Sequence, residues 1–491
     1  MKLSDLFTLL NRHERPSTIL VFLSVALMSA IAGCTTLTTM TTAFQPLPTV
    51  ASLVADAAGG NEGPPAIAGT PAGYIPAAFG SVHDTMPIPL ETPVAVATLG
   101  PPLPAPTIVV AAQPVDFEAA RATAQAQGLD IAFVKIGFHR GPSGNANGWG
   151  NYVRRLNDAG VPVFVKSVDN GGVIWEVQEI MKENEAEGRY VPHVLVYRST
   201  DKGFEDIYYD LSLTPEEAAE LSWQANRDAL PKELDKKYFW LETLNEPGRD
   251  GFDGNLQIER LGRFSLATAK LAVAEGYKYA ALAFSTGVPE VGDWPTASTT
   301  LVNPNDWEDP AMLEFLRYAG EHKDQVAVAL HEYSLTIDCI APPCVFPTPD
   351  PPHIPYPYLV GRLQALFDTA DRHGIPRPTV LITEWGWEYG AVPEPEEAME
   401  DIAWASWLYA AYPEVLGAAI WYLGGPWCCD IDDQTQRLIE PLTNFAASHY
   451  YIIDPGIGRI DPFLFSPNPP TLLELNREDW ATPFPRPRSM P

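Results

Sequence analysis

Two glutamates in this sequence each close an apolar run, in surroundings suited to acid–base chemistry. Glu246 belongs to Leu-Asn-Glu-Pro at 244–247, and Glu384 belongs to Ile-Thr-Glu-Trp-Gly at 382–386. Cleavage of a glycosidic bond requires one carboxyl group to protonate the leaving oxygen and a second to act at the anomeric carbon. Two carboxyls about 5–5.5 Å apart give retention of configuration, whereas roughly 6.5–9.5 Å leaves room for a water and gives inversion. Taken singly, each glutamate could equally be a helix cap or a salt-bridge partner.

Elements that could position these side chains begin at about residue 131, where short apolar runs alternate with helical stretches. Near-continuous runs of this kind are typical of parallel strands buried on both faces. The eight runs are 131–138, 161–167, 193–198, 238–245, 279–284, 326–331, 379–384 and 417–422. Eight strand–helix units predict an α/β fold of the (β/α)8 TIM-barrel type, with the C-terminal ends of the strands at one open face.

Helical patterns separate the runs. The stretch at 215–225 begins with Pro and two acidic residues, and Thr214 stands in the N-cap position. The stretches at 263–274 and 358–367 place apolar residues at i, i+3, i+4 spacing. The run at 107–112, followed by a helical stretch at 116–127, is a candidate ninth unit, interpreted here as an element that precedes the barrel.

Asn-Glu-Pro after the fourth run, with a second Glu closing the seventh, resembles clan A of the glycoside hydrolases over about residues 131–430. Only two strand candidates lie between the glutamates, as the clan's placement on strands four and seven requires, which argues against counting 107–112 as the first strand. The resemblance implies a retaining β-glycosidase with Glu246 as acid/base and Glu384 as nucleophile. It does not identify a family within the clan.

The resemblance also assigns supporting residues. Asn245 would hydrogen-bond the sugar 2-hydroxyl, and Trp421 on the eighth strand would form the floor on which the sugar stacks. His331 and Tyr333 share one face of the sixth strand, so both are expected at the mouth, where Tyr333 would orient the nucleophile. A structural histidine and a core tryptophan are the alternatives for His331 and Trp421.

One position departs from the clan, which usually has an Arg on strand two beside the nucleophile. Lys166 stands on that strand here, Arg198 ends strand three, and His139 and Arg140 follow strand one. These residues are the candidates for the group beside Glu384. Two further glutamates are interpreted as non-catalytic. Glu242 is expected in mid-strand, buried or paired, and Glu388 in the rim.

Tryptophans gather at the predicted strand ends. Eight of the 13 tryptophans lie there or in the loops that follow: Trp149, Trp175, Trp294, Trp307, Trp385, Trp387, Trp421 and Trp427. Flat aromatic rings pack against sugar faces, so this placement predicts several sugar subsites, with Trp385 among the substrate-binding residues. The alternative is that these rings pack on one another.

Charge and motifs limit the partners. The 491-residue chain has a formal net charge of −30, which repels nucleic acid and favours a neutral glycan over an anionic one. Since no nucleotide, phosphate or His-rich metal motif is found, no cofactor and no metal are expected. The last four cysteines, Cys339, Cys344, Cys428 and Cys429, could form disulfides of undetermined pairing or, less readily, a thiolate metal site.

The N-terminus has the pattern of an export signal. Basic residues precede an apolar run at 19–32, and Ala-Gly-Cys at 32–34 resembles a bacterial lipobox. This predicts a lipoprotein outside the cytoplasm, held on a membrane by lipidated Cys34; plain secretion and a retained anchor are the alternatives. The expected organisation is a signal segment at 1–34, a disordered Thr-, Ala- and Pro-rich tether at 35–106, the barrel domain at 107–450 and a Pro-rich tail at 451–491.

Two other functions fit the same residues. A transglycosylase would use the same barrel and let a sugar, rather than water, attack the intermediate. A surface lipoprotein that binds glycans without cleaving them would use only the aromatic face, although the paired carboxylates argue against it.

Overall fold

The computed structural model describes residues 107–110, 115–200, 204–247, 257–286, 306–334, 337, 340, 359–425 and 430–454. The expected signal segment, the tether up to residue 106 and all five cysteines lie outside these residues. Within the described part of the chain, no helix has both the length and the apolar character needed to cross a bilayer.

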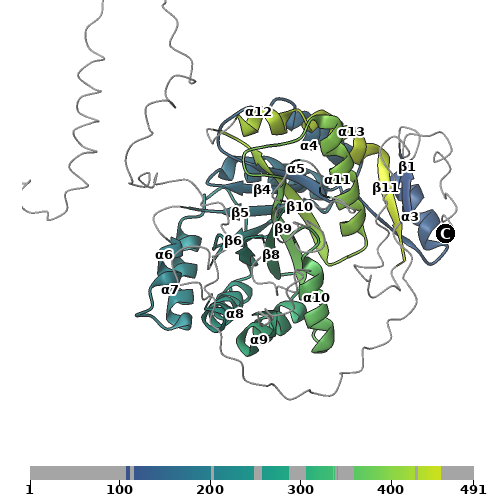
Figure 1. Ribbon diagram of the computed structural model, residues 1–491. Helices are drawn as coiled ribbons and strands as arrows, with labels where there is room; N and C mark the ends of the chain where they lie inside the picture. The colour runs from purple at the N-terminus through teal and green to yellow at the C-terminus, as the bar shows by residue number, and fades with distance from the viewer. Residues whose placement is uncertain are drawn as a thin grey trace, which may run out of the picture. The chain divides into compact units, whose positions relative to one another are not determined.

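The described residues contain a closed barrel of parallel strands, in the order β10-β3-β4-β5-β6-β7-β8-β9 (Figure 1). Its strands are β3 (Ile136–Arg140), β4 (Phe164–Val168), β5 (Val194–Arg198), β6 (Phe239–Glu242), β7 (Lys278–Phe284), β8 (Val326–Tyr333), β9 (Thr379–Gly386) and β10 (Val415–Leu423). Each of the eight apolar runs contributes one strand to the barrel. The barrel and its helices fit the predicted (β/α)8 class.

The first run needs a correction, because 131–138 is not one strand. Its beginning forms β2 (Asp130–Ala132), which pairs with β11 (His449–Ile453) and not with the barrel. β1 (Thr107–Val110) pairs with the other edge of β11, giving a three-stranded antiparallel sheet in the order β1-β11-β2. The run at 107–112 is therefore an element outside the barrel, as predicted, and β11 crosses the boundary that we expected at residue 450.

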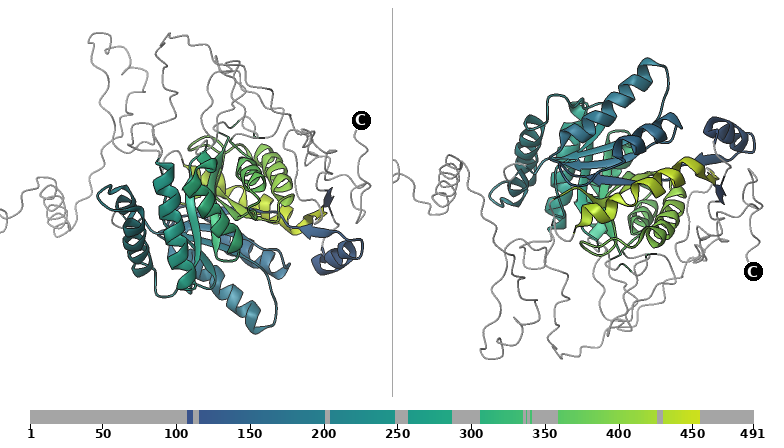
Figure 2. Two further views of the ribbon diagram at one scale, coloured as in Figure 1. Left: turned by 90° about the horizontal axis from the view of Figure 1, so that it is seen from below. Right: turned by 90° about the horizontal axis from the view of Figure 1, so that it is seen from above.

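Helices enclose the ring of strands, as Figures 1 and 2 show. The longer ones are α4 (Trp149–Asp158), α5 (Gly171–Ala186), α7 (Pro215–Asp228), α8 (Ile258–Ala274), α9 (Pro310–Glu321), α10 (Leu363–Arg372), α11 (Pro395–Ala410) and α13 (Ile439–Ser448). Shorter ones are α6 (Phe204–Tyr209), α12 (Ile431–Gln436) and the 3-10 helix η3 (Asp306–Glu308), and α3 (Phe117–Gln125) precedes β2.

Two predicted helix starts have different outcomes. α7 begins as expected, with the Thr214 side chain and Glu217 forming a capping box. α10 begins at Leu363 and not at 358, because Gly361 has a φ of 83° and donates its backbone N–H to the Glu332 carboxylate. That hydrogen bond holds the preceding turn out of helical geometry.

Apolar side chains from seven of the eight strands, β4 to β10, fill the barrel interior below the level of the glutamates. They form a cluster of their own: Phe164, Val196, Trp240, Ala280, Ala283, Ala327, Ala329, Leu381 and Ala419. The Phe164 ring fits there because Gly417 leaves space, since a Cβ on Gly417 would lie 2.4 Å from a ring carbon of Phe164. Gly137 lets the backbones of β3 and β4 approach closely, since a Cβ there would lie 1.9 Å from the Phe164 carbonyl oxygen. Two residues further along β4, β5, β6 and β8 the same face carries Lys166, Arg198, Glu242 and His331, and that level holds the candidate site.

Candidate active site

Glu246 follows β6, the fourth strand of the barrel, in an uncommon backbone conformation. Its φ is 48°, and its N–H donates a 2.9 Å hydrogen bond to the Ala283 carbonyl at the end of β7. Non-glycine residues rarely adopt positive φ, and such strain is found preferentially at functional sites. The side chain is 12% exposed, which leaves the carboxyl accessible at the barrel mouth.

Glu384 lies on β9, the seventh strand, with its side chain 11% exposed. Tyr333 at the end of β8 donates a 2.7 Å hydrogen bond from its phenol to Oε2 of Glu384. On the same strand, His331 Nδ1 lies 3.5 Å from that oxygen. As expected from strand alternation, Glu332 faces away, toward the Tyr409 phenol of α11.

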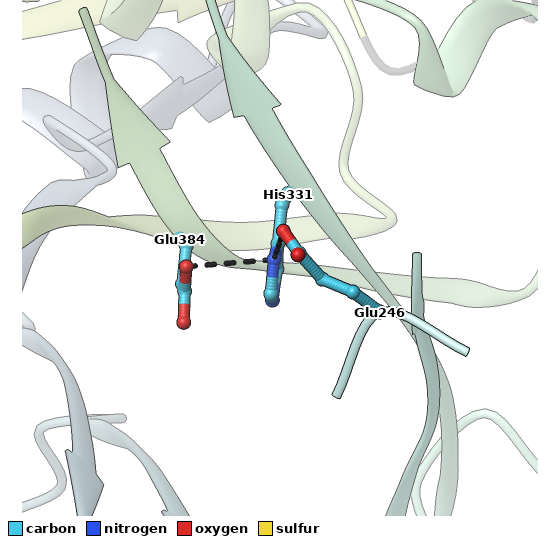
Figure 3. A group of neighbouring side chains, drawn as sticks. All are labelled: Glu246, His331 and Glu384. Atoms are coloured by element: carbon cyan, nitrogen blue, oxygen red, sulfur yellow. Dashed lines mark hydrogen bonds and ion pairs between the residues drawn. The ribbon is translucent and has the colours of Figure 1, made fainter. Parts of the chain in front are cut away.

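His331 lies between the two glutamates, as Figure 3 shows. Its Nδ1 is 3.0 Å from Oε1 of Glu246, a hydrogen bond that a proton on either partner can make. One carboxylate oxygen of Glu246, one carboxylate oxygen of Glu384 and one ring nitrogen of His331 all lie within 4.8 Å of one another. The spacing of the two carboxyls is thus near the range for retention and below the range that accommodates a water for inversion.

A buried charge cluster lies at the same level of the barrel. Lys166 forms an ion pair with Glu242, and Arg198 Nε is 3.7 Å from Oε1 of Glu242. Burial lowers the pKa of Lys166, with Arg198 adding to the effect and Glu242 opposing it. Burial also opposes ionisation of Glu242, but the two cations outweigh it and keep its pKa below its usual value.

This pairing refines what we expected of Lys166 and Arg198. Both had been candidates for the group beside Glu384, yet their ion-pair partner is Glu242 on β6, which is next to the strand of Arg198 and two strands from that of Lys166. Lys166 still interacts electrostatically with Glu384. Glu242 is buried and paired, as expected, but it ends β6 and does not lie in mid-strand. Glu388 is exposed in the loop after β9.

His139 on β3, the first strand, lies on the other side of Glu384. Its Nδ1 is 3.8 Å from Oε1 of that residue, and its ring meets Tyr422 edge-on with centroids 5.0 Å apart. The imidazole is 2% exposed. Burial first, then Lys166, Arg198 and His331, hold its pKa well below the usual value, so the ring is neutral.

Asn245 directly precedes Glu246 and is half-buried. Its Oδ1 is a buried acceptor that has no hydrogen-bond partner among the residues that the structure describes. Such an atom is costly unless something pairs with it, and a substrate hydroxyl would do so.

An aromatic pair stands at the mouth. Trp421 on β10 is half-buried, and Tyr389 stacks on it with ring centroids 5.3 Å apart and an interplanar angle of 28°. Tyr389 is 46% exposed and was missed from the sequence. The rule applied to tryptophans in loops after strands would have found it had it included tyrosine.

The expected tryptophan face is only partly present. Trp385 is fully buried and packs against Trp387 at 5.0 Å, so its assignment to substrate binding was wrong: Glu384 faces inward, and alternation turns the next residue outward. Trp149, Trp307 and Trp387 are buried as well, Trp175 is exposed on α5, and Trp294 and Trp427 lie outside the described residues. Four of these tryptophans therefore pack in the hydrophobic core.

Comparisons with known proteins identify neither a reaction nor a substrate for this chain. No protein-family profile and no curated protein matches the sequence. The solved structure of N2152 from Neocallimastix frontalis is 13% identical with a TM-score of 0.34, and the match covers 68% of this chain and 66% of that one. The YdjI aldolase of Escherichia coli K12 is 10% identical, covering 67% and 94%, with a TM-score of 0.27.

A third solved structure is the full-length tri-modular endo-β-1,4-glucanase B (Cel5B) from Bacillus halodurans. It is 11% identical, with 62% of this chain and 57% of that one covered and a TM-score of 0.30. This chain thus spans less than two thirds of the length of that glucanase and of N2152. At TM-scores this low the likenesses carry no argument, and the barrel rests on its own strand order.

Proposed function

We propose that this chain is a retaining glycoside hydrolase that cleaves β-glycosidic bonds, with Glu246 as acid/base and Glu384 as nucleophile. The single observation that carries the proposal is the approach of the two carboxyls to within 4.8 Å, from the ends of the fourth and seventh barrel strands. The hydrogen bond from Tyr333 to Glu384 supports it, because a nucleophile must be held in one orientation to attack a single carbon.

The proposed reaction has two steps. First, a Glu384 oxygen bonds to the anomeric carbon while Glu246 gives its proton to the departing glycosidic oxygen. Second, Glu246 takes a proton from water, whose oxygen displaces Glu384 from that carbon. His331 suits this exchange, since its Nδ1 contact with Glu246 can form whether the carboxyl has its proton or not.

Charges in the site favour a neutral sugar as substrate. Two cations, Lys166 and Arg198, face two anions, Glu242 and Glu384, so the group is balanced when Glu246 is protonated. Within this group of described residues each cation has an anionic partner, and the net charge of −30 disfavours an acidic sugar further. Asn245 and the pair of Trp421 and Tyr389 are the proposed contacts to sugar hydroxyls and a ring face.

A second candidate function rests on the same three donors. Glu246, His331 and Glu384 could bind a divalent ion, since their donor atoms lie close enough together to share one. Metal-assisted hydrolysis would then replace the covalent step. The Tyr333 hydrogen bond to Oε2 of Glu384 favours the metal-free mechanism, because it fixes the carboxylate in one orientation and uses part of its acceptor capacity.

The testing experiment is a screen on aryl β-glycosides and on β-glucan, mannan and xylan, with the wild type, Glu384→Ala and the exposed control Glu388→Ala. We expect activity in the wild type and control and none in Glu384→Ala. Azide should rescue that variant and give a sugar azide of inverted anomeric configuration, because azide attacks the face that Glu384 has vacated. Failure of rescue, or activity that a chelator abolishes and a divalent ion restores, would overturn the proposal.

Two further outcomes distinguish related functions. Transfer to added sugar acceptors in preference to water would mark a transglycosylase. Glycan binding without turnover, unchanged in Glu384→Gln, would mark a binding protein. The extracytoplasmic, lipid-anchored location through Cys34 remains a proposal from the sequence, which metabolic labelling with a fatty acid would test.

A further inference from the structure

His139 is a buried polar side chain without an evident task. Neither ring nitrogen has a hydrogen-bond partner among the residues that the structure describes. Leaving a buried donor unpaired costs about 1–3 kcal/mol. A strand in the barrel wall could place an apolar residue here instead, so the imidazole calls for a function in the adjacent site.

The two oxygens of Glu384 have unequal surroundings. Oε2 accepts the 2.7 Å hydrogen bond from Tyr333 and lies 3.5 Å from His331. Oε1 lies 3.8 Å from His139 Nδ1, which is beyond hydrogen-bond length. Catalytic hydrogen bonds are often long in the free enzyme and shorten when substrate binds. A small rotation of the carboxylate would bring Oε1 within reach.

His139 would make that contact as a neutral donor. The groups that face it are Lys166 on β4, Arg198 on β5, His331 on β8, Glu384 on β9 and Tyr422 on β10. Two of these are cations, and they disfavour a third positive charge. A neutral imidazole supplies one N–H and leaves the charge balance of the site unchanged.

We propose that His139 is a positioning residue for Glu384, with its Nδ1–H directed at Oε1 while Tyr333 holds Oε2. The two donors, on β3 and β8, approach different oxygens of Glu384 from strands that flank β9 on its two sides, and they fix the rotation of the carboxylate about its Cγ–Cδ bond. This inference rests on the proposed function, because it assigns Glu384 an attack on carbon. It also explains how the site dispenses with the arginine that the family resemblance led us to expect.

The test exploits which ring nitrogen faces Glu384. In His139→Asn the amide nitrogen takes the place of Nδ1, whereas in His139→Gln it takes the place of Nε2. We expect kcat to fall about 10- to 100-fold in His139→Ala and His139→Gln, as for loss of a hydrogen bond to a charged group, with KM within about twofold. His139→Asn should recover most of kcat, and His322→Ala at the end of α9 should match the wild type.

A merely structural histidine would give another pattern. Equal losses in the Asn and Gln variants, an unchanged kcat in His139→Ala, or an effect on KM alone would each overturn the proposal. Thermal unfolding of each variant shows whether it is folded. If a variant does not fold, the role of His139 is tested by the NMR measurement on the wild type.

That measurement does not depend on turnover. Imidazole ¹⁵N–¹H spectra of the wild type, with His139→Asn for assignment, should show His139 neutral and protonated on Nδ1 between about pH 5 and 8. Glu384→Gln should shift its Nδ1 resonance. A proton on Nε2, or an Nδ1 resonance that does not shift in Glu384→Gln, would overturn the inference. These spectra test the role of His139 even if the wild type cleaves no glycoside. Absence of glycoside cleavage would contradict the proposed function but not the orientation of His139.

Discussion

The Tyr333 phenol lies 2.7 Å from Oε2 of Glu384, reaching it from the neighbouring strand of the barrel. β8 and β9 pair with His331 opposite Glu384 and Tyr333 opposite Gly386. The Tyr333 ring lies beside Gly386, since two ring carbons are 3.8 Å from where a Cβ of Gly386 would stand. Its hydroxyl therefore reaches the carboxylate two residues before Gly386 on the neighbouring strand.

Tyr333→Phe should lower kcat about 10- to 100-fold with little change in KM, since it removes a hydrogen bond to a charged nucleophile and no proposed sugar contact. Steady-state kinetics on an aryl β-glycoside measures the effect. The matched control is Tyr190→Phe, at an exposed position before β5. A Tyr333→Phe enzyme with wild-type kcat would mean that Glu384 is held by other groups.

Glu246→Ala should make the rate depend strongly on the leaving group. Without the acid, departure of a sugar or alkyl oxygen should slow by about 10²- to 10⁴-fold, whereas a dinitrophenolate needs no proton and should leave readily. The intermediate then accumulates, because the base for its hydrolysis is missing, and azide should speed its breakdown. A series of aryl glycosides compared with Glu388→Ala measures this. Equal losses for every leaving group would remove Glu246 from the acid role.

Much of the barrel and both glutamates could be predicted from the sequence, because each strand is marked by a short run of neighbouring residues. Strands buried on both faces are apolar throughout, and the alternation of β8 alone places His331 and Tyr333 together. The break between β2 and β3 could not be predicted, since the apolar pattern runs on through Phe133 and Val134 and the partner of β2 is β11, at the far end of the barrel domain.

The pairing of Lys166 and Arg198 with Glu242 could not be predicted either, because it depends on contacts across three strands. The sequence shows two cations and a glutamate but not that they meet. The same holds for Tyr389, whose role depends on the position of Trp421. For Trp385 the signal was present and misapplied: alternation along β9 places it outward once Glu384 faces inward.

Glu242→Gln should destabilise the fold by roughly 3–5 kcal/mol, because it leaves Lys166 and Arg198 buried without their anion. Lys166→Met should cost less, since Arg198 still faces Glu242. Urea unfolding of both variants and of the double variant forms a double-mutant cycle. We expect the double variant to be more stable than the sum of the single losses by more than about 2 kcal/mol. Additive losses would show that the pair is not coupled.

Glu332 should make stability fall as the pH rises. The carboxylate is fully buried and accepts hydrogen bonds from Tyr409 and from the backbone of Gly361, and burial raises its pKa to about 7 from the usual 4.5. The folded protein thus binds this proton more tightly than the unfolded chain. Its contribution is full below about pH 4.5 and is lost as the pH rises through about 7.

The variant that isolates this effect is Glu332→Gln, which is uncharged at every pH. Relative to Glu332→Gln, the wild type should lose roughly 3 kcal/mol of unfolding free energy between pH 4.5 and pH 8, as a shift of this size implies. Asp401, buried against Trp387 with its pKa raised to about 6, acts in the same direction, so Asp401→Asn serves as the parallel variant. Urea midpoints across this range measure both. If Glu332→Gln follows the wild-type pH dependence, then Glu332 is ionised throughout, and a cation such as the neighbouring Arg362 must outweigh its burial.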